Sequence, residues 1–76
     1  MDWRQRISVD PQVCHGQACI KGTRVMVSVI LDNLAAEETV ESIAGAYGIT
    51  WEDIRAVLLY AAELAKERVV PLPGAA

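Results

Sequence analysis

Apolar and polar residues alternate along the first third of the chain, whereas apolar residues recur every three or four positions along the rest. The alternation predicts three short extended segments, over 7–10, 18–21 and 24–27. A loop over 11–16 and a break at Gly22 and Thr23 separate them. For segments this short, an irregular loop with isolated bridges is the alternative. The helical spacing predicts three helices, over 29–36, 40–47 and 51–68.

The pattern therefore predicts one domain over 1–76 that is mainly α. It consists of a short N-terminal β segment over 1–27, a three-helix unit over 28–68 and a flexible tail over 69–76. The tail begins where Pro71 and Pro73 prevent the last helix from continuing, because proline lacks the backbone donor and clashes with the preceding turn.

Capping residues stand where the predicted helices begin and end. Ser28 and Thr39 are suited to accept hydrogen bonds from the first backbone amides of the first two helices. Gly48 stands where a left-handed residue is expected to end the second helix. The stretch from Thr50 to Asp53 has the form of a capping box at the start of the third helix. These signals set the expected boundaries.

The third predicted helix is apolar on more than one face. Its expected core stripe consists of Ile54, Val57, Leu58, Ala61, Leu64 and Ala65. Leu59, Tyr60 and Ala62 lie off that stripe, and a helix of this kind is usually buried from two sides. The tail is either disordered or an extended arm that docks on another protein. The candidate contacts with a partner or a second copy are Leu59, Tyr60, Val69, Val70 and Leu72.

The stretch over 40–59 has the spacing of a helix-turn-helix, in which Ala44 lets two helices cross closely and Gly48 makes the turn. Its second helix would present its exposed N-terminal residues to a major groove. Those residues are Thr50, Trp51, Glu52, Arg55, Ala56 and Leu59. Only Arg55 is suited to a base or a phosphate, and the nearby acidic residues would repel DNA. A helix-turn-helix used purely for packing is at least as well supported.

Length and composition point to a partner. A chain of 76 residues supplies a core worth only about 3–5 kcal/mol. Its composition is 53% hydrophobic without any Phe, and this aliphatic excess favours burial against another chain. Neither a secretory leader nor a run of about 20 apolar residues is present. We therefore expect a cytoplasmic protein that does not contact a membrane.

The charges are unevenly placed. The net charge of −3 divides into +2 over residues 1–27 and −5 over residues 28–76. Any contact with phosphate should therefore involve the first third. The best candidates there are Arg4, Arg6 and Lys21, to which the third helix adds Arg55.

A short motif, Lys21-Gly22-Thr23-Arg24, stands between the β segment and the first helix. Its backbone donors and cations could bind an anion, although it lacks the glycine loop and following helix of a nucleotide-binding P-loop. We favour a structural role, in which Arg24 pairs with a carboxylate such as Asp10. The predicted structural motif consists of Asp10, Gly16, Gly22, Thr23 and Arg24.

Cys14, His15 and Cys19 are three soft ligands within six residues. A structural zinc ion needs four protein ligands, and the chain has no further Cys or His. Nucleophilic catalysis by a Cys-His pair needs an orienting group and a pocket. We therefore expect a buried Cys19, a loop Cys14 and neither a cofactor nor an enzymatic activity.

Several of these residues together resemble a known family. They are Ile7-x-Val9-Asp10-Pro11, Gly16, Ile20-Lys21-Gly22-Thr23-Arg24-Val25-x-Val27, Leu34-Ala35-Ala36, Ile43, Tyr47 and Glu52-Asp53-Ile54-x-Ala56-x-Leu58-x-Tyr60-Ala61-Ala62. In this order they look like the small prokaryotic family known as domain of unknown function 433. The resemblance covers about residues 7–63, and the Gly-Thr-Arg segment followed by Tyr-Ala-Ala is its specific part.

The resemblance implies a homeodomain-like three-helix unit after the β segment, a homodimer, and an antitoxin-like role beside a PIN-like ribonuclease toxin. It brings no catalytic residues. The family usually has glycine where Glu37 stands, and a left-handed non-glycine residue would cost roughly 1–2 kcal/mol. The first helix is therefore expected to continue through Glu37. The family also tends to have an acid near Ser42, so the second helix should fray slightly.

Two hypotheses follow. In the first, the chain is an antitoxin-like dimer whose helices and tail neutralise a ribonuclease, with Glu63 and Glu67 mimicking phosphate. Its basic N-terminal part would bind operator DNA and repress its own gene. In the second, the chain is an interaction or scaffold module that does not bind nucleic acid. The overall acidity and the acidic start of the third helix favour the second hypothesis.

Overall fold

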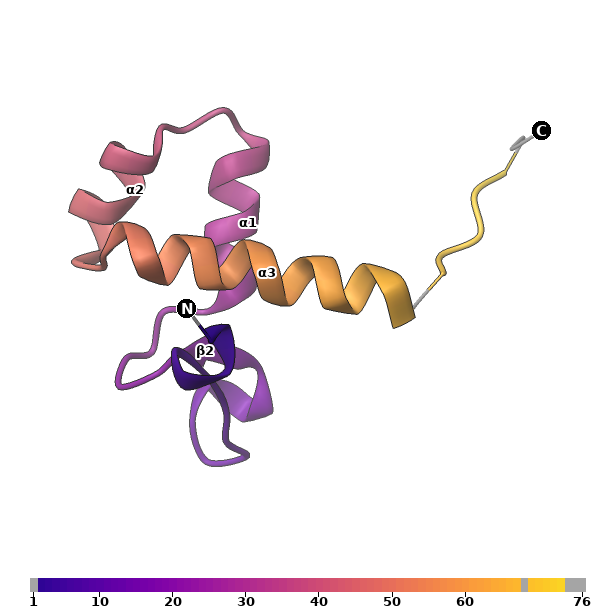
Figure 1. Ribbon diagram of the computed structural model, residues 1–76, viewed down its shortest axis with the longest axis horizontal. Coiled ribbons are helices and arrows are strands. Elements are labelled where there is room, and N and C mark those ends of the chain that lie inside the picture. Colours follow the sequence, from indigo (N-terminus) through magenta and orange to yellow (C-terminus); the bar gives the residue numbers. More distant parts are fainter. Residues whose placement is uncertain (1, 68, 74–76) are drawn as a thin grey trace.

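The computed structural model describes residues 2–67 and 69–73, which form three helices and a small two-stranded sheet (Figure 1). In chain order the elements are η1 (Trp3–Gln5), β1 (Ile7–Val9), η2 (Cys14–Gly16), β2 (Ala18–Ile20), α1 (Val27–Ala35), α2 (Val40–Tyr47) and α3 (Trp51–Glu67). The prediction of a mainly α fold with a short N-terminal β segment is confirmed.

The sheet is smaller than predicted. β1 and β2 pair in antiparallel register, with Ile7 opposite Ile20 and Val9 opposite Ala18. The third predicted extended segment, over 24–27, forms only an isolated bridge between Cys19 and Met26. The prediction of a third extended segment through residue 27 is wrong, because Val27 already belongs to α1. The alternative of isolated bridges holds for this segment.

The start of α1 lies two residues earlier than predicted. Met26 is its N-cap and provides no capping side chain, so the assignment of Ser28 as N-cap is wrong. Val27 and Ile30 are the buried residues of α1, at 5% and 0% exposure, whereas Ser28 is exposed. Burial of Val27 in the shared core extends the helix beyond the position that local capping would choose.

The end of α1 contradicts the expectation that the helix continues through Glu37. The helix ends at Ala35, and Glu37 adopts a left-handed conformation with φ of 67°. The Glu37 amide donates to the Leu34 carbonyl at 3.0 Å and the Glu38 amide donates to the Asn33 carbonyl at 3.1 Å. This is the hydrogen-bond pattern of a Schellman motif, which offsets the conformational strain by satisfying two helix-end carbonyls.

The predicted caps of α2 and α3 are confirmed. The Thr39 hydroxyl accepts from the Ser42 amide at 3.1 Å, and Gly48 ends α2 with φ of 65°. Thr50 and Asp53 exchange two hydrogen bonds, of 3.1 and 3.2 Å, between their side chains and backbone amides. Local side-chain chemistry therefore sets both ends of α2 and the start of α3.

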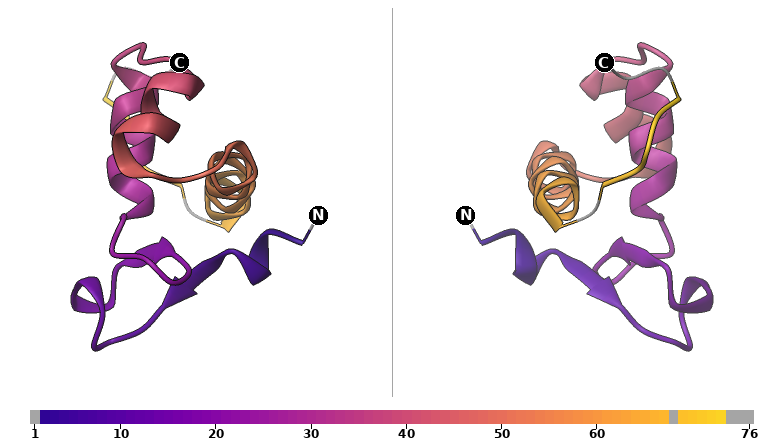
Figure 2. Two further views of the ribbon diagram at one scale, coloured as in Figure 1. Left: turned by 90° about the vertical axis from the view of Figure 1, so that its left-hand side faces the viewer. Right: turned by 90° about the vertical axis from the view of Figure 1, so that its right-hand side faces the viewer.

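The core is aliphatic and draws on both strands and all three α-helices. Ile20, Ile30, Ile43, Ile54 and Val57 are each at most 2% exposed. α3 contacts η1, β1, α1 and α2, so it is the element on which the others pack. Figure 2 shows α3 end-on, with α1 and α2 on one side and the N-terminal segment below it.

The predicted core stripe of α3 is partly wrong. Leu58 is 45% exposed and Ala65 is exposed, whereas Ala56, which was expected on the exposed face, is fully buried. Ile54 and Val57 are buried as predicted. η1 and β1 cover a side of α3 that the periodicity alone assigns to solvent. The buried face of α3 therefore includes Ala56 and leaves Leu58 exposed.

Candidate functional site

The turn between β2 and α1 presents two cations on a well-defined backbone. The Thr23 hydroxyl donates to the Ile20 carbonyl at 2.7 Å and accepts from the Val25 amide at 3.0 Å. Gly22 is left-handed, with φ of 79°, a conformation that glycine adopts without a steric penalty. These contacts hold the turn in one shape, and the side chains of Lys21 and Arg24 on either side of it are exposed.

Neither cation of this turn forms an ion pair with another described residue. Among the described residues, the ion pairs join Arg4 to Asp2, Arg6 to Asp53 and Lys66 to Glu63. The predicted ion pair between Arg24 and Asp10 is therefore wrong. The Asp10 carboxylate instead accepts from the Gln12 amide at 2.9 Å, which uses this side chain to shape its own turn.

A shallow open pocket adjoins the turn. It has a volume of about 490 Å³ and is lined by Ser8, Asp10, Val13, Gly22, Thr23 and Arg24. The sequence predicted that Asp10, Gly22, Thr23 and Arg24 act together, and the structure brings these four to one pocket. Gly16 lies in η2, with φ of 79°. The pocket therefore gives the unpaired Arg24 guanidinium an accessible, partly polar surrounding.

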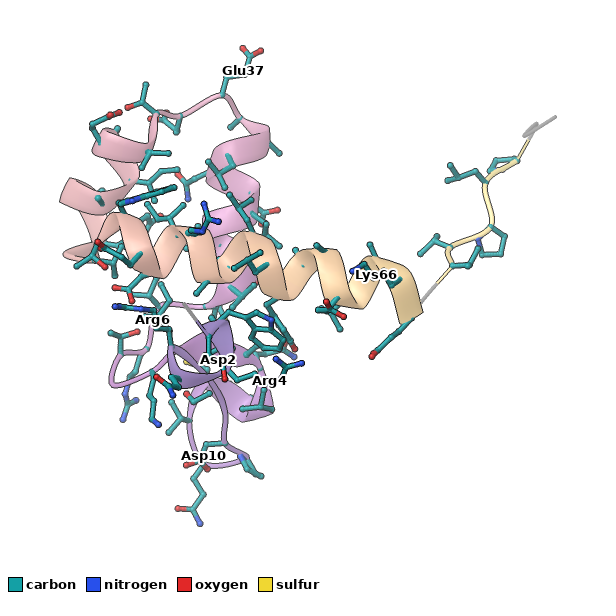
Figure 3. All side chains as sticks on the ribbon, viewed as in Figure 1. Asp2, Arg4, Arg6, Asp10, Glu37 and Lys66 are labelled. Atoms are coloured by element: carbon teal, nitrogen blue, oxygen red, sulfur yellow. The ribbon has the colours of Figure 1, made fainter. Side chains whose placement is uncertain are left out.

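The other predicted phosphate contacts are less available. The Arg6 guanidinium donates to the Asp53 carboxylate at 3.1 Å and is partly buried. This ion pair makes Arg6 less available to phosphate than the exposed Lys21 and Arg24. Arg4 is exposed, stacks 4.6 Å from the Trp3 ring centre and lies 3.6 Å from Asp2. Figure 3 shows Asp2, Arg4 and Arg6 in the N-terminal segment, well separated from Asp10.

The N-terminal end of α3 carries little positive charge. Arg55 is exposed, with its guanidinium 5.9 Å from the Trp51 ring centre. Glu52 is exposed beside it, whereas Ala56 is buried and unavailable to a groove. Within residues 51–57, Arg55 is the single cation, and it stands beside the acidic Glu52 and Asp53.

The predicted partner contacts fall into two groups. Tyr60 packs within the chain against Trp3, with ring centres 5.3 Å apart, so its role as a freely accessible partner contact is wrong. Leu59 is half-buried. The tail residues Val69, Val70 and Leu72 are 89%, 77% and 71% exposed and extend away from the helices (Figure 1). The sequence analysis did not predict the contact between Trp3 and Tyr60. The one indication of it in the sequence is that an aromatic residue, Trp3, precedes β1.

Cys14 and Cys19 lie close together at the base of η2. Cys14 and His15 both have positive φ, of 51° and 55°, which the sequence did not predict. The Cys14 thiol donates to the Arg24 carbonyl at 3.4 Å. Burial, and to a smaller extent the hydrogen bond and charge of Cys14, raise the pKa of the Cys19 thiol to about 11. Cys19 is therefore an unreactive core residue at neutral pH.

Two further features, a metal cluster and a membrane-spanning helix, are absent from the described residues. Within them, no group of three or more His, Cys, Asp and Glu side chains is arranged to hold a metal ion. No helix over that same part of the chain combines the length and apolar character needed to cross a bilayer.

Comparison with known proteins places the chain in a family. A family model described as "Protein of unknown function (DUF433)" matches residues 7–61. The chain belongs to the DUF433 family. The match spans β1, most of α3 and the turn between β2 and α1 that carries Lys21 and Arg24, which we call the cationic turn. The candidate site therefore lies inside the family domain. No curated protein matches the chain.

A solved structure is similar to this DUF433 chain. It is the crystal structure of a DUF433 member protein from Anabaena variabilis ATCC 29413, with a TM-score of 0.75 and 28% sequence identity. The similarity covers 82% of this chain and 62% of that protein. The chain therefore spans less than two thirds of the length of this relative.

Proposed function

We propose that this DUF433 protein is an antitoxin-like homodimer that acts in the cytoplasm. It binds a PIN-like ribonuclease toxin and binds operator DNA to repress its own gene, and it has no catalytic activity of its own. The observation that carries the proposal is the pair of unpaired, exposed cations Lys21 and Arg24 on the turn between β2 and α1. The family resemblance supplies the toxin partner.

The cationic turn supports contact with DNA phosphates rather than reading of bases. Lysine and arginine side chains on a fixed turn can neutralise phosphate, and such contacts position a protein on DNA without sequence information. A homodimer presents the turn twice, which doubles the number of phosphate contacts. Exposed Arg4 adds a weaker contact, since Asp2 partly neutralises it.

The tail supports toxin binding. Val69, Val70 and Leu72 are the most exposed large hydrophobic residues in the described part of the chain. An extended apolar segment of this kind can add to a partner's sheet edge or fill its pockets. Glu67, exposed at the end of α3, would meet a basic RNA-binding surface.

Binding to DNA is tested by fluorescence anisotropy, with duplex DNA from upstream of the gene, at several salt concentrations. Affinity should fall steeply with salt, because phosphate contacts release counterions. The double variant Lys21→Ala, Arg24→Ala should reduce the log–log slope by about two per chain. Arg55→Ala is the matched control and should leave the slope unchanged. An unchanged slope in the double variant would show that the turn does not contact DNA.

Binding to the toxin is tested by co-expression with the nuclease encoded beside the gene. The wild-type chain should co-purify with the nuclease and suppress its RNA cleavage. Val70→Asp together with Leu72→Asp should abolish both effects, while the same change at exposed Val9 should leave them intact. Suppression that survives the tail variant would assign toxin binding to another surface.

One observation favours the alternative of an interaction module that does not bind nucleic acid. Arg6 is held by Asp53, and exposed Glu52 stands where a reading helix would approach DNA. These features remove one cation and add an anion at the predicted DNA-facing end of α3. Absence of any DNA affinity at low salt, together with a stable complex with a protein partner, would establish this alternative.

A further inference from the structure

One face of α3 is apolar and uncovered within the chain. Trp51 and Leu58 are 50% and 45% exposed, and Ala62 and Ala65 are also exposed. These four residues follow one another at spacings of seven, four and three, so they form a stripe along one side of the helix. We call this set the outer stripe. In Figure 2 it belongs to the helix whose other sides face α1, α2 and the N-terminal segment.

The outer stripe has the spacing by which two helices pack along a common seam. Its large residue, Trp51, lies at the N-terminal end of α3, and its small residues, Ala62 and Ala65, lie toward the C-terminal end. Two identical helices running in opposite directions would place each Trp51 over the alanines of the other copy. Leu58 of each copy would lie near the two-fold axis. Large residues would then fill the space that small ones leave.

The charges in the first and last turns of α3 are complementary in the same orientation. Glu52 and Arg55 lie near the N-terminal end of α3, and Glu63 and Lys66 lie near the C-terminal end. In an antiparallel pair, the first turn of each α3, which carries the acidic Glu52, lies beside the last turn of the other copy, which carries Lys66. Lys66 also pairs with Glu63 of its own chain at 3.4 Å. A parallel pair would instead set like charges against each other, which is unfavourable.

We propose that a second copy of this chain docks antiparallel along the outer stripe of α3. The proposal rests on the homodimer in the proposed function and names the surface that forms it. α3 has 17 residues and is about 25 Å long, enough for several turns of contact. The interface is isologous, since the same stripe serves both copies. It leaves the cationic turn between β2 and α1 outside the seam.

Sedimentation of the full chain at micromolar concentration tests the proposal. The wild-type chain should be a dimer. Leu58→Glu should raise the dimer dissociation constant by at least about tenfold, because a charge would be buried against its own copy. Val9→Glu, at a residue that is 61% exposed on β1, is the control away from the stripe and should remain dimeric. A wild-type monomer, or a dimer that survives Leu58→Glu, would overturn the proposal.

A second variant guards against a folding defect. Ala65→Glu should also dissociate the dimer, since residue 65 would face Trp51 of the other copy. Far-UV circular dichroism should show unchanged helix content in both variants. Tryptophan emission, to which Trp3 and Trp51 both contribute, should shift to shorter wavelength as the wild-type chain is concentrated, and this shift should be lost in both variants. A folded Ala65→Glu chain that stays dimeric would also overturn the proposal.

Charge exchange tests the orientation. Glu52→Lys alone and Lys66→Glu alone should each weaken the dimer, and the double variant should restore it. A parallel pair predicts no such rescue, so failure of the double variant to restore association would overturn the antiparallel arrangement. The toxin and DNA assays report separately. Loss of both binding activities with an intact dimer contradicts the proposed function, whereas a monomer that retains toxin binding contradicts only the seam.

Discussion

The N-terminal third and the helical two thirds of this chain are held in shape by different means. In α2 and α3, capping side chains define where each helix starts, and aliphatic residues at helical spacing form the core. In residues 2–26, the sheet has only three residue pairs. Its shape depends on turns, on left-handed residues and on contacts with α3. Local signals suffice for the boundaries of α2 and the start of α3, whereas the N-terminal third needs contacts with the rest of the molecule.

The largest expected effect comes from removing a buried side chain in the helical region and, separately, in the N-terminal third. Ile54→Ala in α3 and Ile20→Ala in β2 should each lower the free energy of unfolding by about 2–5 kcal/mol, since both side chains are buried in one core. Val9→Ala, on the exposed side of β1, should change it by less than about 0.5 kcal/mol. Urea unfolding at fixed protein concentration measures all three.

The Ile20→Ala variant decides whether the N-terminal third shares the core, because the sheet that contains Ile20 has only three residue pairs. A loss below about 1 kcal/mol for Ile20→Ala would mean that the N-terminal third does not share a cooperative core with the helices.

A second test uses pH to probe the burial of the Cys19 thiol in the N-terminal third. Burial raises the pKa of this thiol from 9.0 to about 11. Above pH 9 the unfolded chain releases this proton while the folded chain keeps it. The free energy of unfolding should therefore fall between pH 9 and pH 11, by about 1–3 kcal/mol.

Other groups also titrate in this range, so the Cys19→Ala variant is the matched control. Its unfolding free energy should fall less steeply over the same pH interval. Equal pH slopes in the wild-type chain and the variant would contradict a buried, protonated Cys19.

A third test compares glycines. Gly48→Ala should lower the free energy of unfolding by about 1–2 kcal/mol, because its φ of 65° is strained for alanine. Gly22→Ala, with φ of 79°, should cost a similar amount in the N-terminal third. Gly45→Ala, inside α2 with open space around it, should instead gain about 0.5–1 kcal/mol. Thermal unfolding of the three variants would show whether backbone conformation constrains both regions equally.

The smallest expected effect is at Glu37, the left-handed corner between α1 and α2, which Figure 3 labels. Glu37→Gly should raise the free energy of unfolding by about 1 kcal/mol, since it relieves the strain and keeps both Schellman hydrogen bonds. Glu38→Gly should give no gain, because it removes the carboxylate that accepts from Ser42. Loss of stability in Glu37→Gly would mean that the Glu37 side chain itself matters.

The sequence predicts the helical region well, and for a physical reason. Thr39, Gly48, Thr50 and Asp53 act within four residues of their hydrogen-bond partners, so their effect is visible in a local pattern. The errors lie where distant residues decide. Val27 joins α1 because the core needs it, and Leu58 is exposed because η1 covers a different side of α3.

The candidate site could be predicted only in part. The grouping of Asp10 with Gly22, Thr23 and Arg24 was visible as a motif, and these residues line one pocket. The sequence did not show which arginine forms an ion pair, because Arg24 and Arg6 have the same side chain and differ only in their place in the fold. Only the folded chain sets Arg6 beside Asp53, 47 positions away, and leaves Arg24 without an ionic partner among residues 2–67 and 69–73.

That long-range ion pair also bears on the order of folding. The loop that joins Arg6 to Asp53 spans most of the helical unit, and the entropy lost on closing a loop increases with its length. Helical turns form within about a microsecond, before such distant contacts are made. We therefore expect α2 and α3 to associate first, and the N-terminal segment to join last, when Arg6 reaches a carboxylate that already caps its helix.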